Sequence, residues 1–159
     1  RRRRQRQMCI RERAKPDELL NYGDGELKEK VNALTGGKGA DVIYDPVGGD
    51  LFDQSCRCIA WNGRLLFVGF SSGPLPEYKA NLALLKGSSM VGVFLGRFRK
   101  EEPSAYENNF AELFSLYEQG KLKPIVTESF AFEDYVAAFN VFTERKVMGK
   151  VTIEIKTEA

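Results

Sequence analysis

Residues 39–70 read GADVIYDPVGGDLFDQSCRCIAWNGRLLFVGF, and this segment decides the fold. A strand-forming run, Val42–Tyr44, stops at Asp45-Pro46 and opens into the glycines at 48 and 49. A helix-length stretch follows, and a second predicted strand, Arg64–Val68, ends at Gly69. Two apolar strands joined by a helix are typical of a βαβ unit in a parallel sheet.

Both predicted strands end at proline or glycine. Open α/β sheets bind their ligands at the carboxyl ends of the strands, so two neighbouring strand ends of this kind favour a ligand site. The alternative is that the glycines only shape tight turns.

Composition fits one ordinary domain, with 159 residues and 43% hydrophobic side chains. The net charge of +2 hides an asymmetry, because residues 1–13 hold seven arginines against the single acid Glu12. We therefore expect a basic arm over residues 1–16. Such an arm is either disordered or an artefact of sequence assembly, or it binds nucleic acid or anionic lipid.

No stretch approaches the roughly 18 consecutive apolar residues of a membrane span. The three cysteines, Cys9, Cys56 and Cys58, fit no zinc spacing, and the absence of histidine excludes a Cys/His metal site. We expect Cys56 and Cys58 to be buried small apolar residues of a reduced, cytoplasmic protein.

Strands and helices are predicted to alternate along the chain, which makes the fold α/β. Asp24 and Asp50 are predicted N-caps, and Ser104 with Glu107 is predicted to form a capping box. The aromatic face of the helix that follows Ser104 is predicted to be core. The expected strands are 18–22, 42–45, 65–68, 89–95, 125–130 and 149–155, and the expected helices are 24–35, 50–60, 81–86, 103–119 and 132–145.

Five blocks in this order carry a resemblance: GADVIYDPVGGDLF, WNGRLLFVGF, LLKGSSMVGVFLG, AELFSLYEQGKLKP and VMGKVTIEI. Over Asp17–Ile155 the chain resembles the zinc-independent NADPH:quinone oxidoreductases of the medium-chain dehydrogenase/reductase superfamily. The resemblance implies the second half of a Rossmann-type doubly wound parallel sheet over residues 17–122. Residues 123–159 are then expected to form a strand–helix–strand segment whose last strand returns toward a GroES-like domain.

The resemblance also implies the cofactor and the reaction: NADPH would pass a hydride to a quinone or an enone. It implies no metal, and we name no catalytic residue. Asp45 is predicted to form a turn rather than to act in catalysis. For Lys150 and Arg145, either of which could reach a cofactor phosphate, a solvated surface charge is an equal alternative. The cofactor-binding residues implied by the matching motifs are Val47, Gly48, Val68, Gly69, Phe70, Phe94, Leu95, Gly96 and Lys150.

One expected motif is absent. No G-x-G-x-x-G follows a strand, and the glycines at 36, 37 and 39 follow a predicted helix, so they cannot place a phosphate at a helix N-terminus. Compared with the family, the chain corresponds to a carboxyl-terminal portion without the GroES-like domain. We therefore expect residues 1–159 alone to be inactive.

Family dimers join through the strand that corresponds to Ser89–Phe94, so a homodimer through this strand is expected. A membrane partner is not expected, and a nucleic-acid partner is disfavoured. The alternative function is a non-catalytic α/β interaction module whose basic arm binds nucleic acid.

Overall fold

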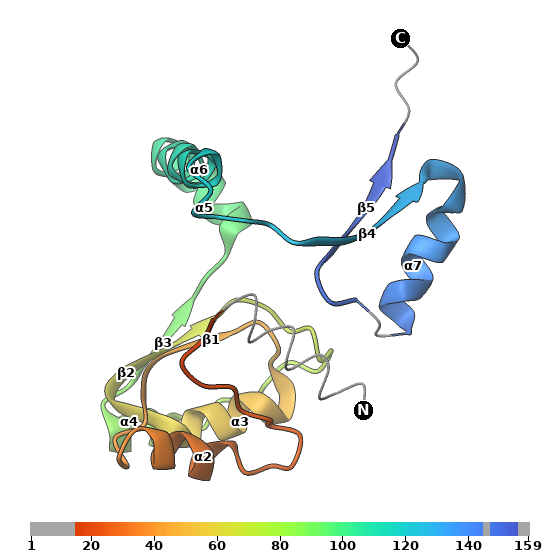
Figure 1. Cartoon of the computed structure of the whole chain (residues 1–159). Helices are drawn as coiled ribbons and strands as arrows, with labels where there is room; N and C mark the ends of the chain where they lie inside the picture. Colours follow the sequence, from red (N-terminus) through yellow and green to blue (C-terminus); the bar gives the residue numbers. More distant parts are fainter. Residues whose placement is uncertain (1–14, 145–146, 156–159) are drawn as a thin grey trace. The chain divides into compact units, whose positions relative to one another are not determined.

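A computed structural model describes residues 15–144 and 147–155 (Figure 1). Most of the predicted basic arm lies outside these residues. The chain divides into two compact units, of which the first is Glu18–Glu102 and the second contains the segment from Pro103 onward. No helix among the described residues is both long and apolar enough to cross a membrane.

The first unit is built on a three-stranded parallel sheet in the order β1-β2-β3. These strands are β1 (Ala40–Asp45), β2 (Ile59–Phe67) and β3 (Ser89–Gly92). Tyr44 pairs with Leu66, and Leu65 pairs with Met90. The order and direction of the strands confirm the predicted parallel α/β sheet. Four helices alternate with the strands: α2 (Leu27–Leu34), α3 (Gly49–Cys58), α4 (Ala80–Lys86) and α5 (Leu95–Glu101).

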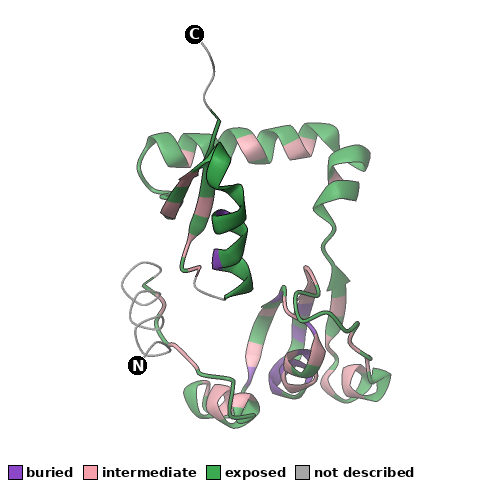
Figure 2. Cartoon of the chain, turned by 90° about the vertical axis from the view of Figure 1, so that its right-hand side faces the viewer, coloured by how far each residue is buried: buried purple, intermediate pink, exposed green. Residues whose placement is uncertain are grey.

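The core of this unit lies between α3 and the sheet (Figure 2). Phe52, Cys56, Ile59 and Leu65 form its buried cluster, and each is at most 2% exposed. The Phe52 ring stacks on Phe67 with 5.0 Å between centroids. The burial of these side chains fixes α3 on the sheet and thereby places the turn that leads into α3.

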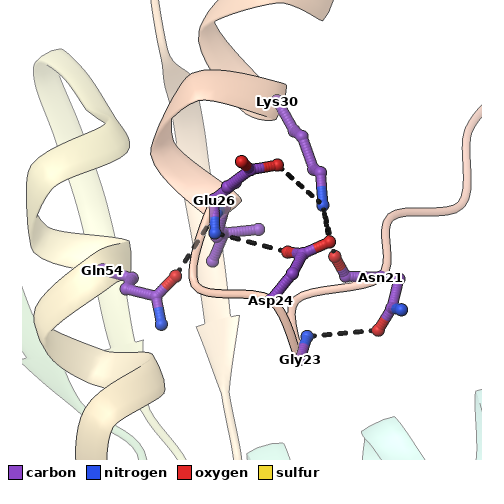
Figure 3. Close-up of polar contacts among 7 residues, drawn as sticks. Asn21, Gly23, Asp24, Glu26, Lys30 and Gln54 are labelled. Atoms are coloured by element: carbon purple, nitrogen blue, oxygen red, sulfur yellow. Dashed lines mark hydrogen bonds and ion pairs between the residues drawn. The ribbon is translucent and has the colours of Figure 1, made fainter.

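Polar contacts link the start of α2 to α3 (Figure 3). The Lys30 ammonium donates to the Asp24 carboxylate and to the Asn21 carbonyl, the latter at 2.9 Å. The Gln54 amide oxygen accepts the N–H of Leu27 at 3.3 Å, which ties α3 to the first turn of α2. The N-cap of α2 is Glu26, so the predicted cap Asp24 is wrong, although Asp24 Oδ1 accepts the Glu26 N–H at 3.3 Å.

Several predicted boundaries in the first unit are wrong. Residues 18–22, predicted as a weak, short strand that is poorly ordered or paired irregularly, form no strand. The N-cap of α3 is Gly48 rather than Asp50, because the turn after β1 enters the helix earlier. The helix ends at Cys58, and β2 begins already at Ile59, which pairs with Ala40 of β1. β3 stops at Gly92, and α5, where the sequence predicts the end of a strand, was not predicted.

The second unit contains two parallel strands, β4 (Val126–Ala131) and β5 (Lys150–Glu154). Between them the 3-10 turn η1 (Phe132–Asp134) leads into α7 (Tyr135–Thr143). Ala138 and Val141 of α7 are buried. The predicted strand–helix–strand order holds, with the single predicted helix divided into η1 and α7.

Helix α6 (Pro103–Glu118) has the predicted extent but differs from prediction in two ways. Pro103 is its first residue, as is usual for proline, so Ser104 lies inside the helix and is not the N-cap of a capping box. No residue of α6 is buried within the described structure, and its Leu113 and Tyr117 are 44% and 57% exposed. The predicted core face of this helix is therefore half-buried at Tyr106 and Phe110 and exposed at Leu113 and Tyr117.

Candidate nicotinamide-binding edge

The ends of β1, β2 and β3 lie side by side at one edge of the sheet, here called the carboxyl edge. The Val68 N–H donates to the Asp45 carbonyl at 3.0 Å, which continues the pairing of β1 and β2 by one residue. The Val93 N–H donates to the Phe67 carbonyl at 2.8 Å and does the same for β2 and β3. The parallel sheet therefore brings three consecutive strand ends to one place, as the sequence predicts.

The loops after β1 and β2 pack on each other. The Pro46 carbonyl accepts the Ser71 N–H at 3.1 Å, and the Val47 carbonyl accepts the Ser72 N–H at 3.0 Å. In the first of these loops, the N–H groups of Val47 and Gly48 donate to the Asp45 carboxylate. The structure thus joins Val47, Gly48, Val68, Gly69 and Phe70 in one wall.

Gly48 is required by this packing. Its φ of +70° disfavours any residue with a side chain, and a Cβ there would lie 3.2 Å from Phe70 Cδ1. The turn alone therefore explains this glycine, so its role in ligand binding stays a prediction. The Phe70 side chain beside this turn is 42% exposed, and Phe94, which follows β3, is 74% exposed.

Asp45 forms the turn that follows β1. Its side chain is buried, with the residue 4% exposed, and Oδ1 accepts the N–H groups of Val47 at 2.8 Å and Gly48 at 3.0 Å. This is the turn-forming role predicted for Asp45. The second carboxylate oxygen, Oδ2, is buried and has no hydrogen-bond partner among the described residues.

The third strand end differs from prediction. Phe94 is the N-cap of α5, and Leu95 and Gly96 lie in the first turn of that helix rather than at the end of a strand. They follow Val93, the last residue bonded to β2, so they remain next to the carboxyl edge along the chain. Sequence reasoning missed Ser72, whose Oγ lies 2.7 Å from the position that a Cβ on Gly49 would take. No sequence signal distinguishes Ser72 from its loop neighbours.

The two residues predicted to reach a cofactor phosphate, Lys150 and Arg145, come from the last part of the sequence. Lys150 is the first residue of β5 in the second unit, its side chain is exposed, and its N–H donates to the Ile125 carbonyl. Arg145 lies outside the described residues. The role of either residue at a cofactor phosphate stays a prediction.

Among residues 15–144 and 147–155, no group of three or more histidine, cysteine, aspartate or glutamate side chains could hold a metal ion. Cys56 and Cys58 are free and buried, as predicted. Burial raises the pKa of both thiols, and that of Cys56 reaches about 11, with the nearby Asp53 carboxylate adding to the effect.

We expect both buried thiols to be unreactive in the folded chain. Raising the pKa of Cys56 from 9.0 to about 11 lowers its thiolate fraction at pH 8 by about 100-fold, and only the thiolate attacks a disulfide reagent. In Cys9→Ser, Cys56 should therefore react with Ellman's reagent at pH 8 about 100-fold more slowly than in guanidinium chloride, and Cys58 should react more slowly as well. Prompt reaction of two thiols in the native chain would contradict this.

Comparison with known proteins identifies the family. The family model described as zinc-binding dehydrogenase matches residues 16–153. This chain belongs to that family. A curated relative, the quinone oxidoreductase-like protein 2 homolog of Nematostella vectensis, is 40% identical over 138 residues, covering 86% of this chain and 38% of the relative. The Bos taurus quinone oxidoreductase-like protein 2 is 36% identical and is covered to 39%.

Solved structures agree with this assignment. A mycobacterial protein solved in complex with NADPH has a TM-score of 0.82 and 25% identity, over 94% of this chain and 47% of that protein. A Pseudomonas syringae quinone oxidoreductase has a TM-score of 0.74 and 26% identity, over 86% and 42%. The predicted resemblance to quinone oxidoreductases is confirmed. The chain spans about two fifths of the length of the curated relatives that it matches.

Proposed function

We propose that this chain is the NADPH-binding part of an oxidoreductase that transfers a hydride from NADPH to a quinone or an enone without zinc. The observation that carries the proposal is the packing of the β1 and β2 end loops into one wall, Val47–Gly48 against Val68–Phe70. Family membership and the NADPH complex of a structural neighbour support the choice of cofactor.

The residues of the carboxyl edge suit a flat, weakly polar ring that carries a carboxamide. Glycine lets backbone N–H and C=O groups come close to an amide, while Val47, Val68 and Phe70 offer apolar surface to the ring. We assign Phe94, Leu95 and Gly96 to the rim of this site and Lys150 to a cofactor phosphate. When bound, NADPH supplies the hydride, and the chain supplies orientation and exclusion of water.

The proposal extends to the organisation of the protein. Residues 17–122 would be the carboxyl-terminal half of an NADPH-binding domain, and residues 123–159 would return toward a catalytic domain. A reaction without zinc is what the resemblance of the five sequence blocks implies. Free, buried cysteines agree with a reducing compartment, and we propose the cytoplasm.

The site can be tested by titrating the ¹⁵N-labelled chain with NADPH to 10 mM while recording amide spectra. We expect the backbone signals of Gly48, Gly69 and Phe70 to shift. The signals of α2 serve as an internal control and should stay in place, because Leu27–Leu34 is not part of the carboxyl edge. Shifts confined to other elements, or no shift at 10 mM, would reject the site.

We also propose a homodimer through β3, and Val91→Lys should shift it toward monomer. β3 is an outer strand of the three-stranded sheet, and Val91 and Val93 are 38% and 42% exposed, so the strand can pair with a copy of itself. Sedimentation at high micromolar concentration should show a dimer for the wild type and mostly monomer for the variant.

Val42→Lys is the matched control, because Val42 lies on the opposite outer strand, β1, and is 48% exposed. It should leave the dimer intact. Loss of association in Val42→Lys but not in Val91→Lys would place the contact on β1, and a monomeric wild type would rule out the dimer.

A further inference from the structure

Asp45 is the one buried charged side chain among residues 15–144 and 147–155. It takes part in no ion pair of this described region, and Oδ2 is without a partner there. Burying a carboxyl group whose second oxygen has no partner is costly unless its other oxygen is well hydrogen-bonded. Asp45 accepts three hydrogen bonds, one at its backbone carbonyl and two at Oδ1.

These three bonds hold the two loops of the carboxyl edge. The backbone carbonyl of Asp45 accepts the Val68 N–H at 3.0 Å, which anchors the loop after β2. Oδ1 accepts the N–H groups of Val47 at 2.8 Å and Gly48 at 3.0 Å, which anchors the loop after β1. One residue thus fixes the backbone on both sides of the wall.

These three hydrogen bonds of Asp45, here called the Asp45 clamp, hold Gly48 in an unusual backbone conformation. Gly48 is buried, is the N-cap of α3 and has φ +70° and ψ −154°, a conformation that is essentially restricted to glycine. Without an acceptor at Oδ1, the N–H groups of Val47 and Gly48 would lose their hydrogen bonds, and the turn would be held only by the bonds from the Pro46 and Val47 carbonyls to the loop after β2.

We propose that Asp45 is a positioning residue that holds the Val47–Gly48 backbone in the geometry that receives the nicotinamide ring, and this rests on the proposed function. Its role requires an acceptor at Oδ1 and not a negative charge. The unpartnered Oδ2 is consistent with this, because no donor among the described residues binds the second oxygen.

The substitution Asp45→Asn would keep the Oδ1 acceptor and remove the charge, whereas Asp45→Ala removes both. Asp53→Asn is the matched control, because Asp53 is a surface carboxylate of α3, paired with Arg57 at 2.9 Å and Lys79 at 3.4 Å, and is outside the wall. The probe is reduced nicotinamide mononucleotide, which carries the ring without the adenine half. Two readouts apply to the full chain: amide hydrogen exchange at Val47 and Gly48, and affinity for the probe.

We expect Asp45→Asn and Asp53→Asn to match the wild type in both readouts. In Asp45→Ala, exchange at Val47 and Gly48 should be at least about 10-fold faster, and probe binding should weaken by about 10-fold or more. If circular dichroism shows Asp45→Ala to be unfolded, Asp45→Ser replaces it. The shorter serine hydroxyl can reach at most one of the two donors, so protection should be lost at one amide or both.

Unchanged exchange in the variants that lack Oδ1 would overturn the proposal. So would loss of probe binding in Asp45→Asn with both amides still protected, because Asp45 would then act on the ligand through its charge. A further outcome is that the wild type fails to bind the probe while the variants show the expected exchange pattern. That result would confirm that the Asp45 clamp holds the turn, but it would reject the nicotinamide ligand and with it the proposed function.

Discussion

Residues 1–159 are expected to bind NADPH with a dissociation constant no lower than about 1 mM, and to show no quinone-dependent NADPH oxidation. The carboxyl edge supplies a wall for the nicotinamide half of the cofactor. The sequence carries no G-x-G-x-x-G after a strand to hold the pyrophosphate. Losing two or three charge-assisted hydrogen bonds of about 1.5–3 kcal/mol each weakens binding by a factor of about 10² or more.

Fluorescence titration of NADPH and a steady-state assay with a simple benzoquinone measure the two parts of this expectation. The uncatalysed oxidation rate is the control for the assay, and the chain unfolded in urea is the control for the titration. A micromolar dissociation constant would show that the three strand ends suffice to hold the whole cofactor. Turnover above the control rate would show that these residues also complete a quinone site.

The βαβ unit could be predicted because its strands are buried, and buried strands leave an apolar run in the sequence. The structure of the region between α3 and Arg64 could not be predicted from the sequence. Ala40 pairs with Ile59 but Val42 pairs with Arg64, so β2 holds extra residues at an irregular point, where Asn62 has φ +57°. Such a bulge is set by the pairing with β1, and Asn62-Gly63 alone predicts a turn just as well.

Two other failures have a similar cause. The apolar run from Met90 to Leu95 predicts one strand, but pairing with β2 ends at Val93, and the unpaired remainder turns into α5. The aromatic spacing of α6 predicts a helix with one apolar face, and the helix is present. What covers such a face is decided by other segments, and the pattern within a helix contains no information about them.

The site was predictable to the extent that it is local. Asp45-Pro46 marks a turn, and glycine follows it, so the end of β1 is recognisable from neighbouring residues. The contact of Gly48 with Phe70 depends on the parallel pairing of β1 with β2, and although that pairing was predicted, no pattern in the sequence specifies the contact itself. The position of Lys150 depends on contacts over a long sequence distance, which local patterns do not specify.

Phe52→Ala is expected to lower the free energy of unfolding by about 3–5 kcal/mol. Phe52 is 1% exposed, stacks on Phe67 and meets Tyr78 edge-on at 6.3 Å, so truncation empties the centre of the buried cluster. The free energy of unfolding of a small domain is about 5–15 kcal/mol, and a core this small places the first unit near the lower end of that range. Urea unfolding followed by circular dichroism measures the change.

The loss should also reach the carboxyl edge. Phe52 holds α3 on the sheet, α3 begins directly after Gly48, and Phe67 directly precedes Val68, so the wall and the core share their supports. The amide signals of Gly48 and Gly69 should therefore broaden or vanish in Phe52→Ala at a urea concentration that leaves the wild type folded.

Phe139→Ala is the control, because this α7 ring is 63% exposed and its removal should change the free energy of unfolding by no more than about 0.5 kcal/mol. The free energy of unfolding of Phe52→Ala could instead lie within about 1 kcal/mol of the wild-type value, as expected for an exposed phenylalanine. In that case the buried cluster under α3 would not be what holds the strand ends together. The wall would then have to be maintained by its own loop hydrogen bonds, including those of Asp45.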